Sequence, residues 1–407
     1  MRILMLAQSF APVIGGEERV VENLSLELAG RGHEVAIATL RQPGADPREP
    51  GGGVRVLPLR SSVSRAAGAG AERLHAPPLP DPETVLDLRR VLRAERFDVV
   101  HAHNWIVHSY LPLDRGRAPA LVLSLHDYGL ICPTKRLLRD GAVCSGPGPV
   151  KCLVNARRQY GLARGAAIEA GTLLRGGAVR RHVDMFLPIS STVAELCRLG
   201  PEDRSRLTPN FIGELPPPPA DADERLAALP DGPFVLYFGD LTEDKGVRHL
   251  IGVYATVSAA PPLVLIGRDH LGAATGRPGI HALGPLPHPY AIEALRRSLF
   301  TVAPSIWAEP FGMVALEAAK AGKPIVASEI GGLRDIVIDG ETGLLVQPGA
   351  AAPLREALER MLGSAELRQR LGAAAATRAS ARFSPEALVP EVERSYELAI
   401  AARAARR

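Results

Sequence analysis

The sequence predicts an α/β protein built from two Rossmann-like, doubly wound parallel-sheet domains. Three observations predict this class. Short apolar runs alternate with helical patterns along most of the chain, which is typical of parallel sheets covered by helices. The chain has 407 residues, more than one hydrophobic core usually organises, so about two domains are expected. Four consecutive prolines, 216–219, interrupt the alternation near the middle of the chain, where a stiff linker would lie.

The first half of the chain opens with a continuous apolar run at residues 3–7, as expected of a strand buried on both faces. Gly15 and Gly16 follow it, and a helical spacing of apolar residues then continues as far as Gly30. Further strands are predicted at residues 35–38, 54–57, 98–101, 121–125 and 185–189, with helices at 83–95 and 192–199.

The second half repeats the pattern, with strands predicted at residues 234–238, 263–266, 300–303, 324–327 and 343–346. Ser384 and Pro385 suit the cap and first turn of a last helix, whose apolar stripe includes Val392 and Tyr396. We expect this helix to pack back on the first domain. The predicted divisions are an N-terminal domain at 1–212, a linker at 213–220, a C-terminal domain at 221–384 and the returning helix at 385–407.

Composition and charge exclude some classes of protein and of binding partner. The balance of 46% hydrophobic and 23% charged residues is that of a globular protein, and the net charge of +4 is only mildly basic. Since no concentrated basic motif stands out, we expect no nucleic-acid partner. The N-terminus lacks the long apolar region and cleavage site of a signal peptide, so a cytoplasmic protein is expected.

One segment is locally basic. Its basic residues have only two acidic residues near them in the sequence, Glu169 and Asp184. They are either the solvated surface of a helix, or a contact for an anionic membrane or a polyanionic acceptor, which would place the protein at the inner face of the membrane. The basic residues are Lys151, Arg157, Arg158, Arg164, Arg175, Arg180 and Arg181.

The segment at residues 305–324, SIWAEPFGMVALEAAKAGKP, carries the richest chemistry. A strand ends just before it, a loop carries Glu309, and Gly312 opens a helix. The free N–H groups at that helix start can bind a phosphate, helped by the helix dipole. Glu317, further along the helix, can offer its oxygens to a vicinal diol such as a ribose, whereas Glu309 can meet a sugar hydroxyl. The alternative is a pair of solvated glutamates on an amphipathic helix.

This segment resembles the signature of glycosyltransferase family 4, in which two glutamates separated by seven residues lie in an E-P-F-G…E-A…G-K-P frame. The resemblance extends over most of the chain, because several further motifs fall in the family's order. These are Pro12…Gly15-Gly16-Glu17, Asp98-Val99-Val100-His101-Ala102-His103, His126-Asp127, Pro209-Asn210, Lys245-Gly246 and Gly331-Gly332…Gly340…Thr342-Gly343.

The resemblance implies a GT-B fold, with the two domains facing each other across a cleft. It implies that a hexosyl-type group passes, with retention of configuration, from a nucleotide-diphosphate sugar such as a UDP- or GDP-sugar to an acceptor hydroxyl. No metal and no cofactor are expected. The donor would bind mainly to the second domain and the acceptor to loops of the first. The sequence leaves open whether the acceptor is a glycan, a lipid-linked molecule or a natural product, and which oligomer forms.

The resemblance also implies roles for particular residues. The catalytic positions are His126, Lys245 and Glu309. His103 with Asn104 and Trp105 would bind the acceptor; His101 and His103 are taken to alternate across a strand end, so that only His103 faces the cleft. The nucleotide-sugar-binding residues are Gly15, Gly16, Lys245, Arg268, Leu286, Glu309, Phe311, Gly312, Met313, Val314 and Glu317.

Two features depart from the family's pattern. Asp240 occupies a position that is usually arginine, and we expect its carboxylate to point away from the donor phosphates or to pair with a cation such as Arg268. Cys132, Cys144 and Cys152 lie where some family members carry a fourth cysteine, but Asn155 stands in its place. A structural zinc site normally has four good ligands, so we expect reduced thiols and no metal. Zinc held with a distant histidine is the alternative.

Two other functions remain open on the same fold. One is a sugar-nucleotide epimerase, which would need no acceptor, or a phosphorylase, which would consume inorganic phosphate. The other is a non-catalytic partner that retains the fold, an alternative raised by Asp240.

Overall fold

The computed structural model describes residues 1–12, 15–42, 46–62, 75–200, 202–272 and 277–406. The chain forms two compact units. The first comprises residues 1–139, 144–210 and 385–407, and the second comprises residues 140–143 and 211–384. A small two-stranded sheet pairs β6 (Leu138–Arg139) with β7 (Ala142–Val143).

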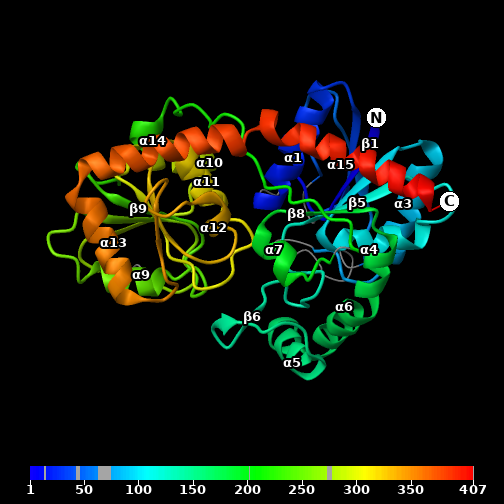
Figure 1. The fold of residues 1–407 in the computed structure, drawn as a ribbon, viewed down its shortest axis with the longest axis horizontal. Coiled ribbons are helices and arrows are strands. Elements are labelled where there is room, and N and C mark those ends of the chain that lie inside the picture. Colours follow the sequence, from blue (N-terminus) through cyan, green and yellow to red (C-terminus); the bar gives the residue numbers. More distant parts are fainter. Residues whose placement is uncertain (13–14, 43–45, 63–74, 201, 273–276, 407) are drawn as a thin grey trace. The chain divides into compact units, whose positions relative to one another are not determined.

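The first unit is built on a six-stranded sheet with the order β3-β2-β1-β4-β5-β8, all pairs parallel (Figure 1). Its centre is β1, whose Ile3 pairs with Val35 on one side and with Val99 on the other. Every strand position from Ile3 to Ala7 is buried, which explains the uninterrupted apolar run. The strands are β1 (Arg2–Ala7), β2 (Glu34–Leu40), β3 (Arg55–Leu59), β4 (Val99–His103), β5 (Ala120–Leu125) and β8 (Met185–Pro188).

Helices connect these strands and cover the sheet (Figure 1). Helix α3 begins one residue before its predicted start, with the Asp81 side chain accepting a hydrogen bond from the Thr84 amide and Pro82 in the first turn. The helices of this unit are α1 (Gly16–Gly30), α3 (Pro82–Ala94), α4 (Val107–Tyr110), α5 (Pro149–Tyr160), α6 (Leu162–His182), α7 (Ser191–Leu196) and α15 (Pro385–Ala405), with short 3-10 turns η1 (Asn104–Ile106) and η2 (Leu111–Leu113).

The second unit repeats the plan with a sheet of order β11-β10-β9-β12-β13-β14, again parallel throughout. Leu236 in its central strand pairs with Val264 on one side and Thr301 on the other. Apolar clusters fill both faces of this sheet. The strands are β9 (Val235–Phe238), β10 (Leu263–Ile266), β11 (Ile280–Gly284), β12 (Thr301–Ala303), β13 (Ile325–Ser328) and β14 (Leu344–Val346).

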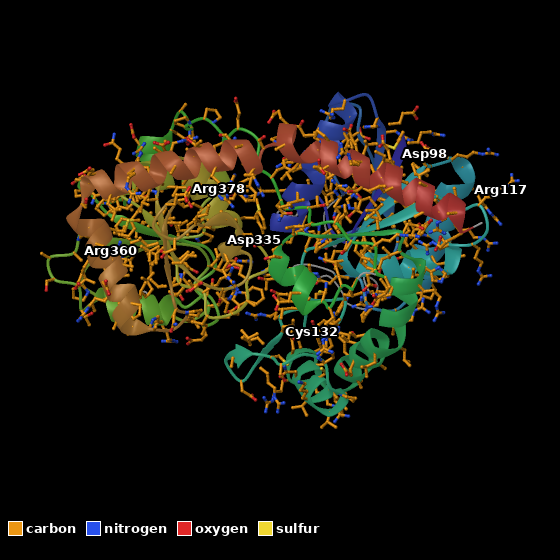
Figure 2. The ribbon with its side chains drawn as sticks, in the orientation of Figure 1. Asp98, Arg117, Cys132, Asp335, Arg360 and Arg378 are labelled. Atoms are coloured by element: carbon orange, nitrogen blue, oxygen red, sulfur yellow. The ribbon has the colours of Figure 1, made fainter. Side chains whose placement is uncertain are left out.

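The helices of the second unit hold its loops as well as its sheet. Arg378 of α14 donates to the carbonyl oxygens of Asp335 and Ile336, and so closes the end of α12 (Figure 2). The carbonyl groups in the last turn of a helix have no hydrogen-bond donor within the helix. Here the Arg378 guanidinium donates to them. The helices are α8 (Ala222–Arg225), α9 (Val247–Tyr254), α10 (His288–Arg297), α11 (Met313–Lys320), α12 (Leu333–Ile336), α13 (Ala351–Gly363) and α14 (Ala365–Arg382).

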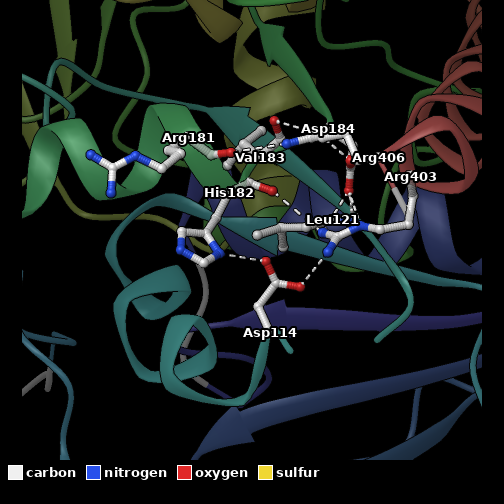
Figure 3. Close-up of polar contacts among 8 residues, drawn as sticks. All are labelled: Asp114, Leu121, Arg181, His182, Val183, Asp184, Arg403 and Arg406. Carbon is white, nitrogen blue, oxygen red and sulfur yellow. Dashed lines mark hydrogen bonds and ion pairs between the residues drawn. The ribbon is translucent and has the colours of Figure 1, made fainter. Parts of the chain in front are cut away.

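The last helix, α15, packs on the first unit, as the sequence predicts. Its Arg403 bridges two carboxylates that are almost fully buried, Asp114 at 2.7 Å and Asp184 at 2.8 Å (Figure 3). Arg406 also pairs with Asp184, and His182 contacts the second oxygen of Asp114 at 2.7 Å. Buried carboxylates are stable only when paired, so this end of the first unit depends on α15.

Two elements differ from the sequence prediction. Strand β11 was not predicted, because it lies at the sheet edge and its exposed His281 and Ala282 break the apolar run. The proline segment was predicted to be a separate linker at 213–220, but it lies within the second unit. The carbonyl of Pro216 accepts a hydrogen bond from Arg296 of α10 at 2.6 Å, which fixes the segment on that unit.

Candidate active site

The second sheet reverses its strand order between β9 and β12. In open parallel sheets ligands bind outside the carboxyl ends of the strands at such a reversal. The loop after β9 carries Lys245, and the loop after β12 carries Glu309. The structure brings these two predicted residues together, with Lys245 Nζ 2.5 Å from Glu309 Oε1. Ser305 donates to the other carboxylate oxygen at 2.9 Å. Glu309 is therefore fixed by one cation and one hydroxyl.

Glycines set the shape of the loop around Glu309. Gly332 donates its N–H to the Glu309 carbonyl at 2.7 Å. A Cβ on Gly331 would lie 2.2 Å from the same oxygen, so this close approach excludes any side chain. Gly312 precedes α11 with φ of 102°, a conformation that L-residues rarely adopt. The close approach at Gly331 and the backbone conformation at Gly312 therefore explain why the family-like frame has glycine at these positions.

Glu317 is the second predicted glutamate, and it is 3% exposed on α11. One of its oxygens, Oε1, lies 2.7 Å from Nε2 of His288, the first residue of α10. Sequence reasoning missed His288, because only the fold brings a residue 29 positions away in the chain to this carboxylate. The contact holds Glu317 in one orientation. The negative charge of the Glu317 carboxylate suits an imidazole that donates a hydrogen bond to it.

Asp240 follows β9 and forms a two-fold contact with Arg268, the residue after Gly267 at the end of β10. Two of the guanidinium nitrogens make this contact: Nε lies 3.3 Å from Oδ1 of Asp240, and Nη2 lies 3.3 Å from Oδ2. The expected pairing with a cation is confirmed. Both side chains are largely exposed, so the pair contributes little to stability. Its effect is electrostatic, since Arg268 neutralises the carboxylate that departs from the family's pattern.

The remaining predicted donor residues of this unit lie around the same loops. Phe311 is buried and packs edge-on against Phe383, with ring centroids 6.2 Å apart. Its role in the described structure is therefore core packing. Met313 and Val314 form the partly exposed first turn of α11, and Leu286 lies partly buried just before α10.

The first unit has its own polar cluster, where its sheet order reverses between β1 and β4. Gly15 and Gly16 begin α1 there, and Glu17 of that helix accepts from Asn104 at 2.9 Å and from Gln8 at 3.1 Å. The Asn104 side-chain oxygen in turn accepts the backbone N–H of His126 at 3.0 Å. Asn104, predicted to bind the acceptor, thus positions His126. It does so from a left-handed backbone with φ of 57°.

Three histidines lie in a row beside this cluster, with His103 in contact with both His101 and His126. His103 Nδ1 lies 2.8 Å from His126 Nε2, while His101 lies 2.8 Å from both Tyr396 Oη and Ser124 Oγ. The prediction that His101 and His103 alternate across the strand end was wrong. Residues two apart on a strand point to the same face, and the two rings lie 4.4 Å apart. Burial lowers the pKa of His126 to about 4 and that of His101 to about 3, so both are neutral at pH 7.

Trp105 packs beneath a loop. Its Nε1 donates to the Gly129 carbonyl at 2.7 Å, and the Lys135 ammonium lies 4.1 Å from the ring centroid as a cation–π contact. That ring face is not free to stack on a sugar. Trp105 still lines a cavity of about 650 Å³ in the first unit, together with Tyr160 and Ile168. Among the described residues the charged groups on its wall are cationic, namely Lys135, Arg136 and Arg164.

The cysteines carry free thiols, and Cys132 and Cys152 are buried. Cys132 contacts Thr134, Cys144 contacts the Gly146 carbonyl, and Cys152 accepts from the Gly148 amide. Asn155, at the position of the family's fourth cysteine, donates to the Leu138 carbonyl at 2.9 Å. Within the described ranges, no group of three or more potential ligands could hold a metal ion.

Comparison with protein families gives two matches that together span most of the chain. The family described as Glycosyltransferase Family 4 matches residues 14–213. The family described as Glycosyl transferases group 1 matches residues 221–378.

Curated relatives are similar over nearly the full chain. A glycogen synthase of Mycobacterium tuberculosis (strain CDC 1551 / Oshkosh) is 28% identical over 97% of this chain and 94% of the relative. A D-inositol 3-phosphate glycosyltransferase of Nocardia farcinica is 28% identical over 92% of this chain and 83% of the relative.

Solved structures share the architecture. Sucrose-phosphate synthase from Thermosynechococcus elongatus is similar with a TM-score of 0.73 and 23% identity, covering 98% of this chain and 99% of that one. The Anabaena protein HepE, solved in complex with UDP-glucose, is similar with a TM-score of 0.67 and 18% identity over 98% and 99%. At these identities the likeness shows the fold, which is GT-B.

Proposed function

We propose, because this chain belongs to glycosyltransferase family 4, that it transfers a hexosyl group from a nucleotide-diphosphate sugar with retention of configuration and without a metal ion. Its glycosyltransferase activity follows from the family. Retention, independence from metal and cofactor, and the roles of individual residues are the proposal.

The observation that carries the donor site is the Lys245–Glu309 contact at the reversal of the second sheet. A diphosphate needs positive charge where the leaving group develops. Lys245 and the N–H groups that begin α11 would supply it, which makes a metal ion unnecessary. When the donor binds, Lys245 would turn towards the phosphates and Glu309 towards a sugar hydroxyl. Glu317, oriented by His288, would hold the ribose diol.

His126 is proposed to contact the transferred sugar, as the family's histidine does at this position. Its lowered pKa supports a neutral imidazole that exchanges hydrogen bonds with a hydroxyl rather than a charged group. The leaving diphosphate would accept the acceptor's proton, so a separate general base is not required.

The acceptor is proposed to bind the first unit. The cavity beside Trp105 supports this, since its aromatic and apolar wall with Lys135, Arg136 and Arg164 suits a molecule that carries both an apolar part and an anionic group. Lys135 supports the argument, because its buried ammonium forms an ion pair with Asp127 at 3.7 Å but makes no hydrogen bond within the described part of the chain. An anionic oxygen would satisfy it.

The experiment begins with a thermal-shift screen against nucleoside diphosphates and their hexose derivatives, because a ligand that binds the folded state raises the melting temperature. The donor identified in this way is then incubated with amphiphilic acceptors in EDTA, and the anomeric configuration of the product is read by NMR. We expect the donor's configuration to be retained and the rate to be unchanged by EDTA. Inversion, loss of activity in EDTA, or turnover without any acceptor would contradict the proposal.

A further inference from the structure

Helix α6 exposes an apolar face for which the structure shows no packing partner among the described residues. Leu162 and Leu174 are 69% and 77% exposed, and Leu173 lies beside them. At 100° per residue these leucines and the small exposed residues between them fall within about two fifths of the helix circumference. The small residues are Ala163, Ala167, Ala170 and Gly177.

The opposite side of α6 already packs on the protein. A Cβ on Gly165 would lie 2.6 Å from the Ala156 carbonyl of α5, and one on Gly171 would lie 2.9 Å from Leu79. The helix therefore has one apolar face buried within its unit and a second one exposed. A helix that is apolar on both sides normally buries both.

Helix α5 lies beside α6 and extends the exposed surface (Figure 1). Its Val150 is 78% exposed, and Val154 follows one turn later. Nine large hydrophobic side chains are exposed among the described residues, and five of them lie on these two helices. Scattered exposed leucines need no explanation, but such a concentration indicates an interaction surface.

The charges on the same helices define the partner. Residues 149–182 contain seven arginines and lysines and one carboxylate, Glu169, which is buried. Arg157, Arg158 and Arg164 are exposed. Leucines flanked by cations are the composition that binds the interface of an anionic bilayer. A second copy of the chain fits poorly, because it would bring the same cations face to face.

We infer that the exposed surface of α5 and α6 docks this protein on an anionic lipid bilayer, with the leucines inserted at the headgroup boundary and the arginines at the lipid phosphates. No helix in the described ranges is long and apolar enough to cross a membrane, so the contact lies in the plane of the interface. Tyr160 and Arg164 of these helices also line the cavity beside Trp105. A lipid-borne acceptor would therefore reach that cavity from the docked face.

The test is co-sedimentation of the full chain with phosphatidylglycerol vesicles and with phosphatidylcholine vesicles, at about 0.1 M and about 0.5 M salt. Neither donor nor acceptor is present, so the result is independent of the proposed transfer reaction. We expect binding to the anionic vesicles only, weakened by salt. The double variant L162Q/L174Q should bind at least about tenfold more weakly, since both leucines lose their burial in lipid.

The matched control is L86Q/L398Q, which replaces two leucines of the same unit that are 51% and 45% exposed on α3 and α15. It should bind as the unaltered chain does, and both variants should melt at its temperature. Equal binding by L162Q/L174Q, or no binding to anionic vesicles, would overturn the inference. So would a concentration-dependent dimer in sedimentation velocity that L162Q/L174Q abolishes, because the face would then belong to a second copy.

Discussion

At the scale of single residues, Glu309 joins two loops that follow different strands, since it contacts both Lys245 and Ser305. Replacing Glu309 or Glu317 by alanine should lower kcat/KM at least about tenfold, because each loses a charged hydrogen bond worth roughly 1.5–3 kcal/mol. Steady-state kinetics measure the effect. Glu243→Ala is the matched control, since Glu243 lies in the Lys245 loop but pairs on the surface with Arg248. Unchanged kinetics in both variants, with unchanged melting, would remove the glutamates from the site.

The buried histidines make a second prediction, on pH. Burial lowers the folded-state pKa of His101, His103 and His126, whereas in the unfolded chain each protonates near its ordinary value. The unfolded state therefore binds more protons, and stability falls as the pH drops below about 6.5. At about pH 5 each histidine should lower the free energy of unfolding by about 2 kcal/mol.

Urea unfolding at neutral and mildly acidic pH measures this loss. His126→Gln should reduce the pH dependence, whereas His281→Gln, at an exposed position of β11, should leave it unchanged. Stability that is constant or rises on acidification would show that these imidazoles already carry a proton in the folded chain.

At the scale of elements, the Arg403 guanidinium of α15 lies between two buried carboxylates, those of Asp114 and Asp184. Arg403→Ala should lower the free energy of unfolding by about 3–5 kcal/mol, because Asp114 and Asp184 would be left with less compensating charge. Arg394→Ala on the same helix is the control, since Arg394 is exposed and lies 3.9 Å from Glu391. Equal, small effects of the two variants would show that the network contributes little.

The same scale shows what the sequence could predict. Interior strands such as β1 and β10 were predicted closely, because burial on both faces demands an uninterrupted apolar run. The edge strand β11 was not predicted, because an exposed strand does not need an uninterrupted apolar run. In the candidate site, the spacing of Glu309 and Glu317 within the family-like frame was the basis for predicting both residues, and their roles stay a prediction. His288 was not predicted, because its link to Glu317 exists only through the packing of α10 against the sheet.

At the scale of the whole molecule, each unit has its own sheet and core, so the two should unfold separately. We expect two transitions in differential scanning calorimetry. A nucleoside diphosphate should raise only one of them, which we assign to the second unit, whereas Arg403→Ala should lower only the other. A single transition shifted by both changes would show that the units unfold as one.

The path of the chain has a further consequence during synthesis. Residues 211–384 of the second unit are continuous, but the first unit is completed only by α15, which is synthesised after all of the second unit. Until then Asp114 and Asp184 lack Arg403, and His101 lacks Tyr396. Domains usually mature in the order of their synthesis. Here the order is reversed, because most of the first unit is translated before the second unit but reaches its final state after it.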